Sequence, residues 1–92
     1  MTSNFQEKRR EPRLPAAGLV SFHPIDAPSS QSVHGRLIDT SLHGFRAAHS
    51  SPGLVSGQEV LFSHSGASGR ARVAWNRILA GAVETGFYIL AP

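Results

Sequence analysis

The alternation that decides the fold lies at residues 70–76, which read Arg70-Ala71-Arg72-Val73-Ala74-Trp75-Asn76. Ala71, Val73 and Trp75 occupy every second position, and two arginines, an alanine and an asparagine fill the others. Successive side chains of a β-strand point to opposite faces, so the pattern predicts a strand with one buried face. We expect Trp75, and Phe87 in the last apolar stretch, to pack in the core.

Five further stretches show the composition of short strands and are bounded by turn-forming residues. They lie at residues 17–23, 33–40, 44–49, 58–63 and 83–90. The turn signals recur at intervals of roughly 8–12 residues, and helical periodicity is weak throughout. The sequence therefore predicts an all-β fold, a small six-stranded antiparallel β-barrel.

A chain of 92 residues is expected to form one domain. Residues 1–14 are polar and basic, and Pro12 disfavours a helix across them. Because so few apolar side chains cannot offset the entropy of ordering, we expect a flexible N-terminal arm at residues 1–14. The barrel is then expected at residues 15–92.

The charge distribution indicates an anionic partner. Nine lysines and arginines against six acidic residues give a net charge of +3, and four of the nine cations fall between Lys8 and Arg13. No apolar run is long enough for a membrane span, and there is no cysteine for a disulfide or a thiolate site. We expect a cytoplasmic protein.

The residue inventory argues against an enzyme. The acidic residues form no recognisable acid–base pair, and no Ser-His-Asp set has a supporting motif. The five histidines are spread over different predicted strands and loops without metal-ligand spacing. We therefore expect neither catalysis nor a metal site.

Two motifs carry the functional prediction. The first is Arg9-x-x-x-Arg13 in the arm, with Arg10 between the two arginines. A guanidinium can bind phosphate or the O6/N7 edge of guanine bidentately, and its plane can stack on a base.

The second motif is Asp39-x-Ser41-x-x-Gly44, at the end of a predicted strand. Its carboxylate can accept hydrogen bonds from guanine N1 and N2, and its serine can bond phosphate. The glycine permits a positive φ or a close approach to ligand. The same residues also favour an ordinary turn that binds nothing, and this reading stays open.

In this order and spacing, the two motifs resemble those of the PilZ domain family. The resemblance continues in residues 71–75, similar to that family's penultimate strand, and in residues 86–89, similar to its last strand. It covers nearly the whole chain, from Lys8 to Leu90. Ile89 departs from the phenylalanine that the family commonly has there.

The resemblance implies a six-stranded barrel that binds the bacterial second messenger cyclic di-GMP, with no further cofactor. The implied ligand-binding residues are Arg9, Arg13, Asp39, Ser41 and Gly44, and Arg10 is added as a neighbouring cation. Ordering of the arm on ligand binding would be the signal that an unidentified downstream protein reads.

Two other functions are weighed against this one. A divergent PilZ-like domain can act as a ligand-independent adaptor for a protein partner, but such domains typically lack both motifs. A small basic barrel can bind single-stranded nucleic acid, which requires aromatic residues interleaved with cations on a strand face. Arg70 and Arg72 instead alternate with small or aliphatic residues, so nucleic acid is the less favoured ligand.

Overall fold

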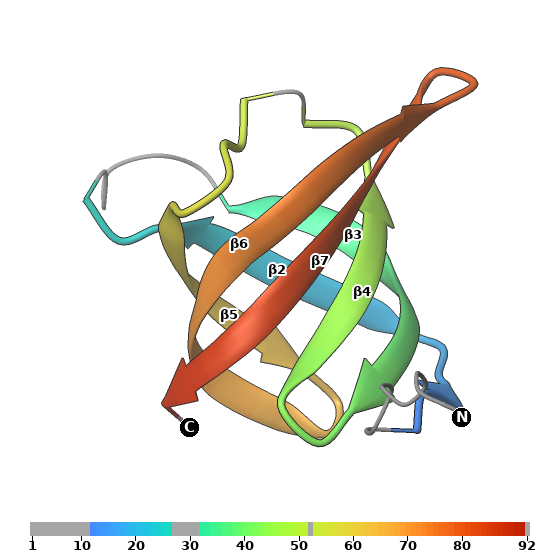
Figure 1. The fold of residues 1–92 in the computed structure, drawn as a ribbon, viewed down its shortest axis with the longest axis vertical. Helices are drawn as coiled ribbons and strands as arrows, with labels where there is room; N and C mark the ends of the chain where they lie inside the picture. The colour runs from blue at the N-terminus through green and yellow to red at the C-terminus, as the bar shows by residue number, and fades with distance from the viewer. Residues whose placement is uncertain (1–11, 27–31, 52, 92) are drawn as a thin grey trace, which may run out of the picture.

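The computed structural model of this chain describes residues 12–26, 32–51 and 53–91. These residues form seven β-strands and no helix (Figure 1), and so none that could cross a membrane. The strands are β1 (Leu14–Pro15), β2 (Leu19–Pro24), β3 (Val33–Ser41), β4 (Gly44–His49), β5 (Glu59–His64), β6 (Ala67–Leu79) and β7 (Ala82–Ala91). The predicted flexible arm lies largely outside the described residues, and the predicted boundary at residue 14 falls within β1.

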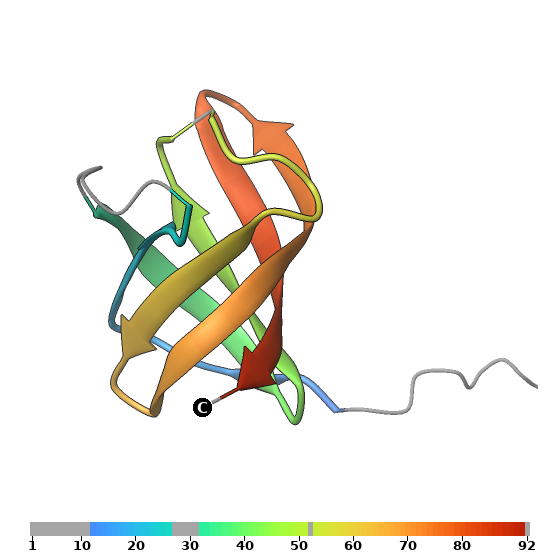
Figure 2. The same ribbon diagram turned by 90° about the vertical axis from the view of Figure 1, so that its left-hand side faces the viewer.

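The strands close into a barrel, as the sequence predicts. Their order is β1-β3-β2-β5-β6-β7-β4, and an additional pairing of β4 with β3 closes the sheet into a barrel (Figures 1 and 2). Every pairing is antiparallel. Strands β2 to β7 form the six-stranded barrel. The short β1 is an extra strand that pairs with β3 beyond the residues that pair with β2.

Alternate residues of each strand fill the interior with aromatic and aliphatic side chains. The ring centroids of Phe45 lie 4.7 Å from Phe87 and 4.8 Å from Phe62, and Phe22 lies 5.1 Å from Phe87. All four phenylalanines are nearly inaccessible to solvent. Burying each such side chain contributes about 1.5–3 kcal/mol, so this cluster stabilises the closed barrel. The core position predicted for Phe87 is confirmed.

The core position predicted for Trp75 is wrong. The pairing of β6 with β7 shifts between Val73, opposite Phe87, and Trp75, opposite Gly86. Phe87 faces the core, so its neighbour Gly86 and the paired Trp75 face outward. A bulge inserts one extra residue into a strand and reverses the alternation beyond it, which a sequence pattern alone does not reveal.

A directed chain of hydrogen bonds crosses the interior at one end of the barrel. The buried His49 accepts the Ser51 amide at Nδ1 (3.1 Å), so its Nε2 carries the proton and donates to Thr85 Oγ1 (2.7 Å). Thr85 donates to Asn76 Oδ1 (2.6 Å), and Asn76 Nδ2 donates to the Leu54 carbonyl (3.0 Å). This chain of hydrogen bonds requires a neutral His49 imidazole, because a protonated Nδ1 would face the Ser51 amide, which is itself a donor.

The chain of hydrogen bonds through His49 predicts a fold that acid destabilises. Burial lowers the pKa of His49 below its ordinary value of 6.5, so the unfolded chain takes up this proton at a higher pH than the folded one. The stabilisation is therefore complete above about pH 6.5 and is lost progressively as the pH falls below it. We expect the free energy of unfolding to decrease between about pH 7.5 and about pH 5 in urea titrations.

His49→Gln is the control, because burial also lowers the pKa of His64 and so adds a slope of the same sign. The variant should depend less steeply on pH than the wild type. An identical slope for the two proteins would show that His49 does not carry the effect.

Candidate functional site

The β3–β4 hairpin places two motif residues on the outer surface of the barrel. Its two-residue turn is closed by the pairing of Ser41 with Gly44, and Thr40 pairs with Phe45. Phe45 is in the core, so Thr40 also faces inward. The side chains of Asp39 and Ser41, on either side of Thr40, therefore face outward.

Cross-strand pairing extends two outward rows from these residues. The first row runs over β3, β4, β7 and β6 through Asp39, Arg46, Gly86 and Trp75. The second runs over the same strands through Ser41, Gly44, Tyr88 and Arg72. Each row contains a glycine next to an aromatic residue, so the aromatic rings border positions that have no side chain.

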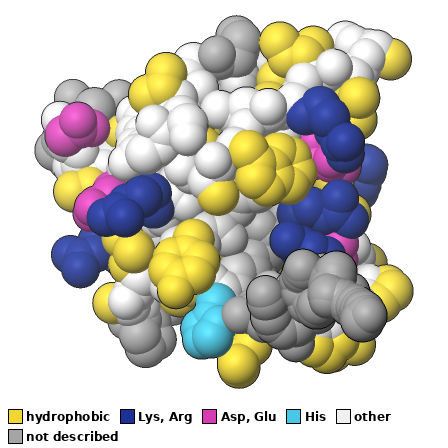
Figure 3. Space-filling model, viewed as in Figure 1, with side chains coloured by type: hydrophobic (Ala, Val, Ile, Leu, Met, Phe, Trp, Pro, Cys, Tyr) yellow, Lys and Arg dark blue, Asp and Glu magenta, His cyan; other side chains and the backbone are white. Residues whose placement is uncertain are grey.

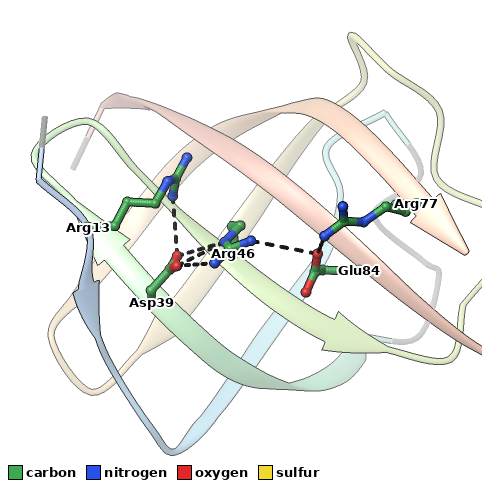
Figure 4. A network of polar contacts seen from close by, with 5 residues as sticks. All are labelled: Arg13, Asp39, Arg46, Arg77 and Glu84. Carbon is green, nitrogen blue, oxygen red and sulfur yellow. Dashed lines mark hydrogen bonds and ion pairs between the residues drawn. The ribbon is translucent and has the colours of Figure 1, made fainter. Parts of the chain in front are cut away.

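Asp39 is the centre of the polar contacts in the first row. Its side chain is only 8% exposed. Arg46 donates from Nε to both carboxylate oxygens, at 3.1 and 2.9 Å, and its Nη2 contacts Oδ2 as well. Arg13 donates from Nη1 to Oδ1 at 3.2 Å. Both oxygens are thus engaged by arginines (Figure 4).

The contacts continue from Arg46 along the outer face as alternating charges. Glu84 lies 3.8 Å from Arg46 and also contacts Arg77 (Figure 4). The guanidinium carbon of Arg77 is 5.7 Å from the centre of the Trp75 ring. The hydrogen bonds that Arg46 donates to Asp39 raise the pKa of Arg46 above its ordinary value. We call Arg13, Asp39, Arg46, Glu84 and Arg77 the ionic chain. Its three arginines and two carboxylates leave a net charge of +1.

A pocket of about 140 Å³ lies beside the ionic chain. Its lining includes Arg13, Ser41, Gly44, Trp75 and Tyr88. These residues come from β3, β4, β6 and β7 and from the segment before β1. Residues from distant parts of the sequence thus meet at one hollow of the outer face. Its chemical groups are aromatic rings, a hydroxyl and a guanidinium.

Two glycines of the pocket region allow their neighbours on the adjacent strands to approach closely. A Cβ on Gly44 would lie 2.3 Å from the Phe87 carbonyl oxygen, and a Cβ on Gly86 would lie 2.4 Å from the Trp75 indole. The φ of Gly44 is outside the left-handed region, which four other glycines occupy. Of the two roles that the sequence leaves open for Gly44, a positive φ is wrong. The structure shows tight packing against β7.

The predicted site residues are therefore brought together in part. Arg13, Ser41 and Gly44 line one pocket, and Asp39 contacts Arg13 at its edge. Arg9 and Arg10 lie outside the described residues. Among those that are described, no three His, Asp or Glu side chains are close enough to hold a metal ion.

Sequence reasoning missed Arg46, which belongs to neither motif. A usable signal was present. In a hairpin with a two-residue turn closed by Ser41 and Gly44, the residues two positions beyond each end are paired. Those residues are Asp39 and Arg46. Trp75 and Tyr88 carry no comparable signal, because the bulge in β6 decides which face Trp75 occupies.

A scan against protein-family models finds no match for this chain, and a search of the curated proteins finds no similar sequence. Membership of the PilZ family is accordingly a hypothesis that is supported by the sequence motifs.

The contacts of Asp39 predict a marked loss of stability in Arg46→Ala. The substitution removes the charge-assisted hydrogen bonds of a carboxylate that is almost fully buried, which typically costs about 1.5–3 kcal/mol. Arg70→Ala is the control, because Arg70 is half exposed and lies 3.8 Å from Glu59, a pair expected to contribute about 0–1 kcal/mol. Urea denaturation should separate the two variants, and equal losses would contradict the importance given to Asp39.

Proposed function

We propose that this chain is a PilZ-type receptor that binds cyclic di-GMP in the outer-face pocket. The observation that carries the proposal is the convergence of two motifs. Arg13 and the Ser41–Gly44 pair are far apart in the sequence, yet they line the same hollow. A coincidental turn motif would have no reason to meet an arginine from the N-terminal segment.

The groups around the pocket suit a guanine nucleotide. The Arg13 side chain is 48% exposed and contacts Asp39 through one nitrogen, so further N–H donors remain for a phosphate or a guanine edge. The hydroxyl of Ser41 can bond a phosphate oxygen. The rings of Trp75 and Tyr88 offer faces on which a base can stack.

Asp39 receives a different role from the one the sequence suggests. Its oxygens are occupied by Arg13 and Arg46, so it acts as a positioning residue that aims Arg13 at the pocket. A direct bond to guanine N1 and N2 would require Asp39 to exchange one of these arginines for the ligand.

The remaining parts of the proposal concern signalling. Arg9 and Arg10 of the arm would add cations that meet the two phosphates of the ligand, and ordering of the arm would expose a new surface to a downstream protein. A receptor of this messenger acts in the bacterial cytoplasm, so the proposal includes that location.

Calorimetric titration with cyclic di-GMP tests the proposal, with GTP and cyclic di-AMP as controls for guanine and for the cyclic dinucleotide. We expect selective binding of cyclic di-GMP. Arg13→Ala should weaken it by about tenfold or more, because a charge-assisted hydrogen bond is lost. Arg70→Ala should leave the affinity within about twofold, since Arg70 pairs with Glu59 away from the pocket.

Three outcomes would contradict the proposal. Equal losses in Arg13→Ala and Arg70→Ala would mean that charge attracts the ligand without a site. No binding of any nucleotide would favour the adaptor function. Binding of a single-stranded oligonucleotide in preference to the cyclic dinucleotide would favour the nucleic-acid alternative.

A further inference from the structure

The outer face continues from the pocket through Tyr88, which lines it, to a second group of cations. Tyr88 pairs with Gly44 on its pocket side and with Arg72 on its other side. Its side chain is 52% exposed, although it lies in the middle of a strand. Gly44 places no side chain against the Tyr88 ring, and the His43 ring lies beside it at a centroid distance of 6.1 Å and a tilt of 32°.

Two arginines of β6 share one carboxylate beyond Tyr88. Arg72 donates from Nη2 to Glu59 Oε2 at 3.2 Å, and Arg70 lies 3.8 Å from the other oxygen of Glu59. The two arginine side chains are 50% and 51% exposed. One negative charge thus faces two positive ones, which leaves this group with a net charge of +1 and with unused guanidinium donors.

Viewed from outside, basic side chains gather in two groups on opposite sides of this face, with hydrophobic side chains between them (Figure 3). Among the residues that the structure describes, Arg46 and Arg77 of the ionic chain meet at Glu84 on β7, whereas Arg70 and Arg72 of β6 meet at Glu59 on β5. Tyr88 and Trp75 are the aromatic residues of β7 and β6 that face outward between these groups, whereas Phe87 faces the core. A ligand with one base and one phosphate needs only the pocket, whereas a dinucleotide has a second base and a second phosphate to place.

We propose that Tyr88 and Arg72 form a second subsite, in which Tyr88 stacks on the second purine of the ligand and Arg72 contacts the adjoining phosphate. This inference rests on the proposed function and names the part of the face that would recognise a dinucleotide. From Gly44 to Arg72 the row spans two interstrand spacings of about 4.8 Å each, within the reach of two linked nucleotides. Neither residue belongs to the two sequence motifs.

Arg70 offers a matched control for Arg72. The two arginines lie on the same strand, are equally exposed and share Glu59, so their removal changes the net charge identically. They differ in their neighbour on β7, because Arg72 pairs with Tyr88 and Arg70 with Ala91. Any difference between the variants therefore reports on the position next to Tyr88.

Calorimetric titration with cyclic di-GMP should show an affinity about tenfold lower for Arg72→Ala and within about twofold of the wild type for Arg70→Ala. Tyr88→Leu should weaken binding more than Tyr88→Phe, because stacking needs the ring and not the hydroxyl. Thermal unfolding should give similar melting temperatures for the two arginine variants, since each loses one exposed contact with Glu59.

The result that overturns the inference is binding by the wild type, sensitive to Arg13→Ala, with no difference between Arg72→Ala and Arg70→Ala. That result would leave the pocket as the whole site and the proposed function intact. Failure of the wild type to bind cyclic di-GMP would overturn the proposed function and this inference together.

Discussion

The contact between Asp39 and Arg46 organises the candidate site. A carboxylate that is 8% exposed is costly to bury unless its oxygens are bonded, and Arg46 bonds both of them from the opposite strand of the hairpin. The pair has a second consequence, because Asp39 also accepts Arg13. A residue that precedes β1 is thereby held across β3, beside the pocket.

The site lies on the outside of the barrel for a steric reason. A closed six-stranded barrel fills its interior with its own side chains, here a cluster of phenylalanines, so a ligand of nucleotide size must bind elsewhere. The outer face gains depth where Gly44 and Gly86 lie side by side with aromatic residues. The bulge in β6 completes the pocket by turning Trp75 outward over Gly86.

The strands were predictable because alternation and turn residues are local. The predicted strand at residues 44–49 coincides with β4, whereas β6 extends beyond the predicted 70–76 at both ends, because the turns on either side of it need only residues 65–66 and 80–81. The residues of the candidate site were predictable where they belong to one of the two short motifs, as do Arg13, Ser41 and Gly44. Arg46 and Trp75 acquire their roles through pairing between strands, and a one-residue bulge is enough to change the face.

The central claim is that cyclic di-GMP binds on the outer face at the pocket beside Gly44 and Gly86, and an NMR titration of the amide resonances tests it most directly. The account predicts that the largest shifts occur at Gly44, Gly86 and the Trp75 indole. Gly57, which lines a separate hollow with Ile25, should stay unchanged. Shifts centred on Gly57, or shifts spread evenly over the barrel, would contradict the claim.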